Sequence, residues 1–430
     1  MKKVFIFIAH SVVITFLYLK VLSSYLWMMY STKILEQEYS YDKLIEKHRR
    51  NARRYKVVAT SFKGGLIKLA QFVSTQKELI HPVIIKELET LQDRVDPISY
   101  EEIKELFYKE TGLYPDDVFD DFEEKSIASA SFGQVHRAKL KSGEIVAVKI
   151  QYDSMDKILA IDMAMAGHFI KLISMIFKRP QLIDMYKEIK EALFLELDYR
   201  KEAEYAKVFK DNFKDNPDIN APKIYEDYTS QKVLVSDFID GYRINDIEKM
   251  EELNISPKDI LSKLMDSYFQ QFYYDGFFHS DPHPGNIFFL DDGSLSFIDF
   301  GQARKLDESL KNSLMSAVIG ILSYDSVKIV DSFCEMGVID KESSGRLKYL
   351  VDEVLTRVST GSAVEIRNMA MDFDFVRNKL VSISREMNIQ FPDGIVLYGR
   401  TIAYLNGLIG FLAPADDMFE MARVSFMKRL

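Results

Sequence analysis

The stretch that decides the fold of this chain reads His279-Ser280-Asp281-Pro282-His283-Pro284-Gly285-Asn286, and Asp299-Phe300-Gly301 follows it. Asp281 precedes Asn286 by five residues, and Asp299 follows Asn286 by thirteen. Mg²⁺ prefers hard oxygen ligands, which in proteins are carboxylates and amides together with the phosphates of a substrate. The stretch therefore predicts a site for Mg²⁺ and phosphate, in which Asn286 and Asp299 are the candidate metal ligands.

The residues between these two ligands predict a β-hairpin. Two short apolar runs, 287–290 and 294–298, are joined by Asp291-Asp292-Gly293, which is a typical turn sequence. Such a hairpin carries Asn286 at one end and Asp299 at the other, so it brings the two ligands together.

A phosphate-covering loop is predicted upstream, over residues 128–135. Its sequence ASASFGQV keeps the G-x-G-x-x-G-x-V spacing of the protein-kinase pattern, with alanine at the first two glycine positions. Alanine still lets backbone N–H groups approach a phosphate, with less freedom than glycine. The residues expected to face the phosphates are Ala128, Ser129, Ala130, Ser131 and Gly133.

A lysine for the phosphates follows on a predicted strand. Residues 145–150 are rich in β-branched side chains, and Val146-Ala147-Val148-Lys149 closely matches the V-A-I-K strand of kinases. Lys149 is the candidate partner of the α- and β-phosphates. Its acidic partner is expected on a predicted helix over 186–209, where four carboxylates remain possible: Glu196, Asp198, Glu202 and Glu204.

These motifs, in this order and together with Lys68-Leu69-Ala70-Gln71, resemble the UbiB/AarF family, also called the ABC1 atypical kinases. The likeness runs from about Arg53 to the C-terminus. It implies an α+β, bilobal protein-kinase-like fold, with a small β-rich N-lobe, a mostly helical C-lobe and an N-terminal helical extension. The resemblance also implies that a K-x-G-Q motif in the extension folds over the active site, where a protein substrate would otherwise bind.

The resemblance assigns roles by matching position. Lys68 and Gln71 are the K and Q of the extension motif, and Glu196 and Asp198 are an E-x-D pair expected to contact the extension near Lys68. Glu202 then becomes the ion-pair partner of Lys149, Asp281 the catalytic residue, and Asn286 and Asp299 the magnesium ligands. The implied cofactors are ATP, or ADP, and Mg²⁺.

Two positions depart from the expected patterns. Ala70 stands where the family has glycine, and the added methyl group puts the fine geometry of Lys68 in doubt. Ser280 replaces the arginine of the H-R-D pattern, so we expect no activation-loop phosphosite acting through that arginine. The five charged and amide groups of the nucleotide site are all present, which argues against a dead pseudokinase.

Composition excludes several classes of protein. The chain has 430 residues, of which 47% are hydrophobic and 28% charged, as in ordinary globular proteins. Its net charge of −9 argues against a general nucleic-acid binder. Cys334 is the single cysteine, so no intrachain disulfide can form and a reducing compartment is indicated. The scattered histidines predict no zinc site.

The N-terminus is unusually apolar from Val4 to Tyr30, interrupted mainly by His10 and Lys20. A single-pass anchor, a helix on the membrane surface and a helix packed on the protein all remain open. We expect no signal cleavage, because no small-x-small site follows cleanly. Six lysines and arginines then lie within residues 47–56, with Arg49, Arg50, Arg53 and Arg54 predicted on one helix face. These basic residues favour attraction of the chain to anionic lipid headgroups. They also favour a location of the following domain at the cytoplasmic face of a membrane.

The predicted organisation has four parts: an apolar segment (1–35), a helical extension (36–120), an N-lobe (121–240) and a C-lobe (241–430). Residues 395–412 are apolar but contain Arg400 and Asn406, so a buried helix is expected there, and no C-terminal membrane anchor.

Three functions remain open. The first is an Mg²⁺-ATP-dependent atypical kinase or ATPase, for which the resemblance implies a role in quinone or isoprenoid-lipid biosynthesis at a membrane, with a lipid-biosynthesis complex as partner. The second is a small-molecule phosphotransferase, although nothing in that class calls for Lys68, Gln71 and the Glu196/Asp198 pair. The third is a nucleotide-gated lipid-binding scaffold without phosphotransfer.

Overall fold

The structure is a computed structural model that describes residues 2–34, 40–62, 65–75, 80–91, 97–129, 132–360, 392–413, 421 and 423–425. The chain divides into two compact units. The first comprises residues 1–203 and 224–238, and the second comprises residues 204–223 and 239–430. Both helices and mostly antiparallel sheets are present, as the predicted α+β class requires.

The first unit contains a five-stranded sheet. Its strands are β1 (Phe119–Phe122), β2 (Ala128–Ser129), β3 (Gly133–Leu140), β4 (Ile145–Gln151) and β6 (Val233–Asp237). The order is β1-β3-β4-β6, β2 also pairs with β3, and all the pairs are antiparallel. Strands β3 and β4 form a hairpin, whose turn contains Gly143 at φ +104°. The alternating burial of β4 directs Val146, Val148 and Ile150 into the core and Lys149 to the other face.

Short helices flank this sheet. They are α5 (Tyr100–Thr111), α6 (Pro115–Val118) and the 3₁₀ turn η1 (Glu226–Tyr228). Ser99 and Glu102 form a capping box at the start of α5, and Gly112 in the left-handed region ends the helix. Ile103 and Phe107 of α5 are buried against the apolar face of the sheet.

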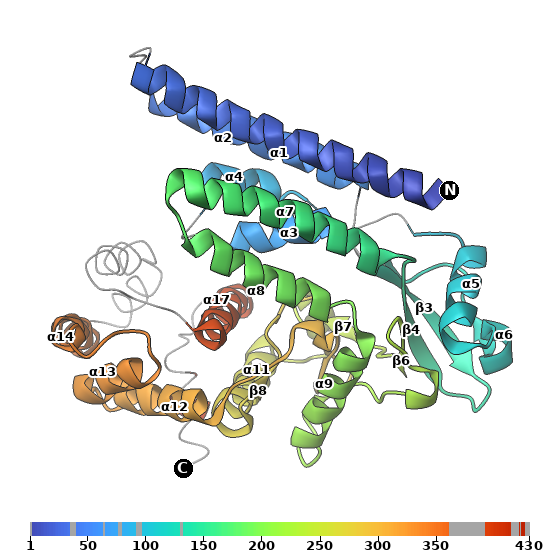
Figure 1. Cartoon of the computed structure of the whole chain (residues 1–430). Helices are drawn as coiled ribbons and strands as arrows, with labels where there is room; N and C mark the ends of the chain where they lie inside the picture. Colours follow the sequence, from blue (N-terminus) through green and yellow to red (C-terminus); the bar gives the residue numbers. More distant parts are fainter. Residues whose placement is uncertain are drawn as a thin grey trace. The chain divides into compact units, whose positions relative to one another are not determined.

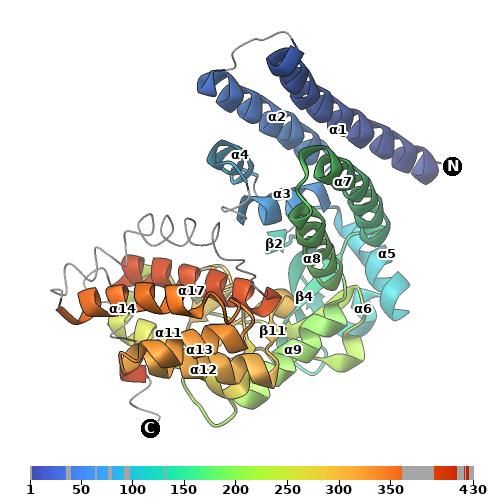
Figure 2. The ribbon, with the colours of Figure 1, turned by 60° about the vertical axis from the view of Figure 1, so that its left-hand side comes forward.

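The other helices of this unit form a helical layer (Figure 1). They are α1 (Lys2–Ile34), α2 (Tyr41–Phe62), α3 (Gly65–Thr75), α4 (Pro82–Leu88), α7 (Met155–Phe177), α8 (Gln181–Leu195) and the start of α9 (Tyr199–Asn212). In both ribbon views α1 lies beside α2, and α7 beside α8 (Figures 1 and 2). Ile14 and Leu17 of α1, Leu66 and Leu69 of α3 and Leu159 of α7 share one buried core.

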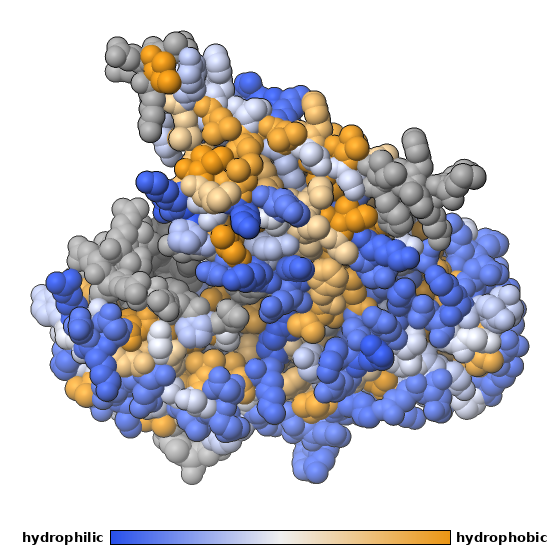
Figure 3. Space-filling model, in the orientation of Figure 1, coloured by the Kyte–Doolittle hydropathy of each residue, from blue (hydrophilic) through white to orange (hydrophobic). Residues whose placement is uncertain are grey.

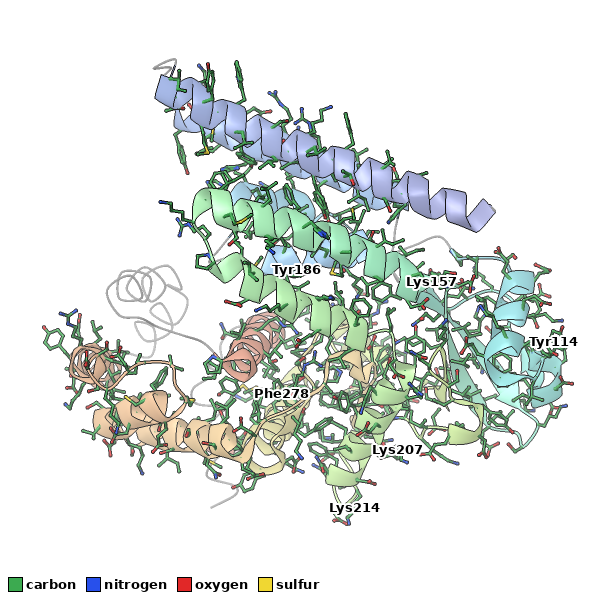
Figure 4. The ribbon with its side chains drawn as sticks, viewed as in Figure 1. Tyr114, Lys157, Tyr186, Lys207, Lys214 and Phe278 are labelled. Atoms are coloured by element: carbon green, nitrogen blue, oxygen red, sulfur yellow. The ribbon has the colours of Figure 1, made fainter. Side chains whose placement is uncertain are left out.

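Helices α7 and α8 approach each other closely. The Tyr186 hydroxyl on α8 donates to the Met163 carbonyl on α7 at 2.7 Å (Figure 4). A Cβ at Gly167 would lie 2.6 Å from that hydroxyl, so only glycine permits the contact. The two helices are separated at Arg179-Pro180.

The predicted single helix over 186–209 is wrong in one respect. The structure ends α8 at Leu195 and begins α9 at Tyr199. The Asp198 side chain accepts the backbone N–H of Arg200 at 3.2 Å, which favours a new helix start over continuation. Charge periodicity alone hides this break, because both helices carry similar acids and bases.

The second unit contains the predicted hairpin. Strands β9 (Ile287–Phe289) and β10 (Leu295–Phe297) pair antiparallel, and Gly293 turns the chain at φ +76°. Strands β5 (Ile219–Asn220) and β7 (Tyr242–Arg243) complete a sheet of order β5-β10-β9-β7. A second small sheet pairs β8 (Phe277–Phe278) with β11 (Arg304–Lys305), and the sequence pattern gave no sign of it.

Helices make up most of the rest of this unit. They are α10 (Ile247–Glu252), α11 (Pro257–Gln270), the π-helical turn η2 (Gln271–Asp275), the 3₁₀ turn η3 (Phe300–Gln302), α12 (Glu308–Leu322), α13 (Ser326–Glu335), α14 (Ser344–Thr360) and α17 (Asp393–Leu412). Aromatic side chains from several elements form the core around the hairpin, among them Phe209, Phe272, Phe297 and Phe300. Tilted and edge-on ring contacts hold the hairpin against the helices.

Within the part of the chain that the structure describes, three helical segments are long and apolar enough to cross a membrane: Ala9–Thr32, Met155–Phe177 and Gly394–Leu412. The last corresponds to the predicted helix over 395–412, which buries Thr401, Leu405 and Leu408 and exposes Tyr404 and Phe411. Apolar residues are visible over the upper helices of the face drawn in Figure 3.

Candidate functional site

A lysine–glutamate ion pair lies at the centre of the first unit's sheet. Lys149 stands on β4, opposite Val135 of β3 and Leu234 of β6. Its Nζ donates to both carboxylate oxygens of Glu202, at 2.9 and 2.8 Å. The side chain of Glu202 is only 7% exposed and that of Lys149 22%. Two hydrogen bonds at this distance compensate for much of the cost of removing the two charges from water.

The ring of Tyr199 completes this environment. Its centroid lies 4.9 Å from Lys149 Nζ, where the face of an aromatic ring attracts a cation. The charge pattern left four acids open as partners of Lys149, and the family resemblance assigned Glu202. Both carboxylate oxygens of Glu202 lie within hydrogen-bonding distance of Lys149 Nζ. An ordered lysine of this kind presents a fixed positive charge to a phosphate.

The predicted phosphate loop starts as a hairpin. Ala128 and Ser129 of β2 pair with Val135 and Gln134 of β3. Ala130 and Ser131 lie outside the described residues. The Ser129 hydroxyl lies 2.8 Å from the hydroxyl of Tyr152.

Gly133 is required by a close approach. A Cβ there would lie 2.4 Å from the Ile150 carbonyl oxygen and 2.9 Å from the Tyr199 hydroxyl. The lack of a side chain at Gly133 therefore allows β3 to pack against β4 and Tyr199, beside the Lys149–Glu202 pair.

The extension motif meets one of its predicted partners. Lys68 on α3 lies 3.3 Å from Glu196 at the end of α8, and both side chains are mostly buried. Ala70, which replaces the family's glycine, is 1% exposed inside the helical core. The core accommodates the added methyl group. Gln71 donates from Nε2 to the Leu91 carbonyl at 3.5 Å.

Asp198 has a different environment from Glu196. Both of its oxygens accept hydrogen bonds from the Arg200 guanidinium, at 2.8 and 2.7 Å. These bonds lower the pKa of Asp198 below its ordinary value, despite its partial burial. The carboxylate therefore stays ionised, at the break between α8 and α9.

In the second unit, Asp281 and Asn286 contact each other. Asn286 Nδ2 donates to Asp281 Oδ2 at 3.0 Å and to the Asp281 carbonyl at 3.2 Å. The turn between them is closed by His283, whose carbonyl accepts the Asn286 backbone N–H at 2.8 Å. Because Nδ2 is occupied by Asp281, the amide oxygen of Asn286 is the atom suited to a cation.

Asp299 lies at the other end of the hairpin. The Ile298 backbone N–H donates to the Asn286 carbonyl at 2.9 Å, so Asp299 is one residue beyond a direct partner of Asn286. Asp299 itself adopts φ +59°, which is uncommon outside glycine, and its Oδ1 accepts the Gly301 N–H at 3.3 Å. Such strained backbone is typical of functional sites. Asp281, Asn286 and Asp299 supply the hard oxygen donors that suit Mg²⁺.

The buried His279 supports the chain segments that carry Asp281 and Asp299. His279 Nε2 lies 3.1 Å from the Ile298 carbonyl and 3.0 Å from the Asp299 carbonyl. Its backbone N–H donates to Gln271 Oε1 at 2.8 Å. One side chain thus holds the backbone of Asp299 and stands two residues before Asp281.

Further support comes from residues that sequence reasoning missed. The Ser280 hydroxyl donates to the Gln302 carbonyl, and the Ser280 carbonyl accepts from Thr401 Oγ1 at 3.1 Å. Arg400 Nη2 donates to Gln302 Oε1 at 2.8 Å. The charge of Arg400 in an apolar helix was the available signal, since a charge inside such a helix is expensive without a partner.

A family model described as the ABC1 atypical kinase-like domain matches residues 90–333. The Arabidopsis thaliana protein ACTIVITY OF BC1 COMPLEX KINASE 8, chloroplastic, is 32% identical over 72% of this chain and 42% of its own length. An uncharacterised Synechocystis protein is 30% identical over 79% of this chain and 86% of its own length.

A second uncharacterised Synechocystis protein is 29% identical over 83% of this chain. This chain spans 64% of the length of that relative. A Mycobacterium tuberculosis protein solved in complex with erythromycin has a similar fold, with a TM-score of 0.54 and 22% identity. That likeness covers 87% of this chain and 95% of the other, and it concerns the fold alone.

Proposed function

Because this chain belongs to the ABC1 atypical kinase-like family, we propose that it is an Mg²⁺-ATP-dependent atypical kinase or ATPase. The observation that carries the proposal is the Lys149–Glu202 pair, in which a mostly buried glutamate orients a lysine on the central strand of a sheet. Kinases use such a pair to hold the α- and β-phosphates.

The residues take the following roles. Lys149, oriented by Glu202, binds the phosphates. Asn286 and Asp299 hold the cation, which when bound neutralises phosphate charge. Asp281 accepts a proton from the attacking hydroxyl or positions a water, and its contact with Asn286 supports this placement by keeping its carboxylate fixed.

We further propose that the acceptor or the regulated partner belongs to quinone or isoprenoid-lipid biosynthesis, at the cytoplasmic face of a membrane. The three long apolar helices support an association with a membrane.

The test is Mg²⁺-dependent ATP hydrolysis by the purified full chain and by Asp299→Asn. Removing one metal ligand should lower turnover by about 100-fold or more, because transition-state charge loses its compensation. Asp292→Asn is the matched control, since it removes the same charge from the turn of the same hairpin and keeps an oxygen for the Ser294 N–H. Hydrolysis that is unchanged in Asp299→Asn contradicts the assignment.

A second candidate function is a nucleotide-gated scaffold. It is favoured by the Lys68–Glu196 pair, which ties the extension helix α3 to a residue only six positions before Glu202. Nucleotide binding at Lys149 could then alter the extension without phosphotransfer. Binding of Mg²⁺-ATP with no turnover, with or without lipid vesicles, is the result that supports this candidate over the first.

A further inference from the structure

Helix α1 exposes an apolar stripe from Val12 to Ile34, interrupted by the exposed Ser23. Its members share one face of the helix, at intervals of three or four residues except for the eight residues between Leu19 and Trp27: Val12, Phe16, Leu19, Trp27, Tyr30 and Ile34. Phe16 is 64% exposed and Trp27 60%. From Val12 to Ile34 the stripe is about 33 Å long at 1.5 Å per residue. An apolar surface of this size on a soluble protein marks an interaction site.

The opposite face of α1 is fixed to the protein. His10 Nε2 lies 2.5 Å from Asp162 Oδ1 on α7, and both side chains are buried. The Tyr18 ring stacks on Phe169 at 4.4 Å, and the Tyr25 hydroxyl lies 2.7 Å from His48 Nδ1 on α2. A helix held by buried polar contacts on one side and apolar on the other is suited to lying along a membrane surface.

A cationic cavity of about 530 Å³ lies beside the stripe, where α1 meets α2. Lys47, Arg50 and Arg54 line it from α2, and Trp27 lines it from α1, with neighbouring serine and asparagine side chains. The three cations recur at intervals of three and four residues, so they share one face of α2. The volume is within the range of about 300–1,000 Å³ typical of small-ligand sites.

The basic residues of α2 divide into two groups. Arg49 and Arg53, on the side of α4, are compensated by acids: Arg53 lies 3.0 Å from Glu87, and Arg49 lies 2.7 Å from Glu46 and 3.9 Å from Glu87. The predicted single basic face is therefore split. The other group lines the cavity, where Lys47 Nζ donates to the Ser24 carbonyl and Arg54 Nη1 donates to Asn51 Oδ1. Among the described residues, those that line the cavity include no acid.

The geometry points to a headgroup site for an anionic phospholipid at a bilayer surface. The phosphate lies with Arg50, Arg54 and Lys47, and the acyl chains continue along the apolar stripe of α1. Trp27 stands at the junction of the two, where tryptophan is enriched at membrane–water interfaces. A long apolar stripe adjoining cations on a protein of net charge −9 matches an anionic membrane better than a soluble anion, which has no use for the stripe.

This inference adds a lipid class and a surface orientation to the proposed membrane association. It rests on that part of the proposed function and not on phosphotransfer, so its test uses no nucleotide. ATP hydrolysis measured separately on the same proteins distinguishes a failure of one proposal from a failure of the other.

The experiment is flotation of the full chain with vesicles of phosphatidylcholine, with and without phosphatidylglycerol. We expect binding to the anionic vesicles and about tenfold or greater loss in Arg50→Gln/Arg54→Gln. The matched control is Arg49→Gln/Arg53→Gln, which removes the same net charge from the same helix and should remain within about twofold of wild type. Equal losses in both variants would overturn the site, since general charge attraction then suffices.

Trp27 is the only tryptophan, so intrinsic fluorescence reports on the site directly. Anionic vesicles should shift its emission to the blue, and lipids with brominated acyl chains should quench it. Three results overturn the proposal. They are a shift caused by inorganic phosphate without flotation, a shift that depends on protein concentration with a doubled mass in light scattering, and no shift at all. Circular dichroism melting of each variant checks that loss of binding is not loss of folding.

Discussion

At the scale of single residues, close packing explains which positions of the phosphate loop are constrained. The loop keeps glycine at 133 and has alanine at 128 and 130. Gly133 has no room for a side chain, because the Ile150 carbonyl and the Tyr199 hydroxyl occupy the place of a Cβ. Ala128, in contrast, lies in a strand with an exposed side chain. The glycine is thus retained for packing, which is independent of any ligand.

Gly133→Ala should therefore destabilise the protein by about 1–3 kcal/mol, the usual cost of adding a methyl group to a filled space. The measurement is the free energy of unfolding in urea. Gly345→Ala is the control, because nothing lies within 4 Å of its Cβ and alanine favours a helix over glycine by about 1 kcal/mol. Equal stability of Gly133→Ala and wild type would show that the β3–β4 contact is looser than described.

At the same scale, His279 supports the site through backbone contacts and takes no direct part in the proposed reaction. Its ring holds the backbone at Ile298 and Asp299, and its own backbone is held by Gln271. The neighbouring ring of Phe300 meets it edge-on at 5.3 Å. A buried histidine is in this way the positioning residue for the strained Asp299.

At the scale of elements, the most consequential contact joins α1, α3 and α7 at Asp162. The side chain is 0% exposed, bonded to His10 of α1. Gly65 at the start of α3 approaches so closely that a Cβ would lie 2.6 Å from Asp162 Oδ2. The docking of the apolar N-terminal helix thus depends on one buried carboxyl group.

This carboxyl group predicts a pH dependence. Burial raises the pKa of Asp162 from its ordinary value of 3.8, although the bond to His10 lowers it. A carboxyl group whose folded-state pKa is raised contributes most stability below its unfolded pKa, and that contribution is lost as pH rises through the folded pKa. Compared with Asp162→Asn, wild type should lose stability as pH rises from about 4 through that folded pKa, and the difference should then be constant.

The measurement is the unfolding free energy of both proteins in urea from pH 4 to pH 8. Asp184→Asn serves as the control, because its pair with Lys187 is exposed and screened by solvent. A difference between wild type and Asp162→Asn that is flat across this range, or that rises with pH, contradicts the account.

At the scale of the whole molecule, the residues with proposed nucleotide roles are distributed over both compact units. Lys149 and Glu202 belong to the first unit, and Asp281, Asn286 and Asp299 belong to the second. The last five residues of the first unit's main segment and the first residues of the second are the same helix, α9. Glu202 stands just before the boundary at Ala203.

Nucleotide binding should stabilise the folded chain, because a ligand that binds only the folded state shifts the unfolding equilibrium. At a concentration of Mg²⁺-ATP 100 times the Kd, linkage gives about 2.7 kcal/mol, which amounts to several degrees in Tm. Lys149→Met should abolish most of this shift while Lys157→Met, a lysine on α7, retains it. The measurement is thermal unfolding with and without nucleotide, and an unchanged shift in Lys149→Met would count against its role at the phosphates.

The sequence alone determined the family and much of the local structure. The motif order from Lys68 to Gly301 predicted the UbiB/AarF resemblance, which the family model and the relatives confirm. The hairpin over 287–298 and the strand with Lys149 were predicted because their signals are local: turn residues and β-branched runs.

Only the tertiary structure decided the contacts between distant residues. It placed Glu202, which the family resemblance assigned and which the charge pattern alone left among four acids, at hydrogen-bonding distance from Lys149, and it gave His10 a buried partner 152 positions away. It also divided the arginines of α2 between α4 and the α1 cavity, which a helical wheel cannot do. The physical reason is common to all three: which of several similar side chains is desolvated beside an opposite charge depends on how helices pack, and packing is not a property of local sequence.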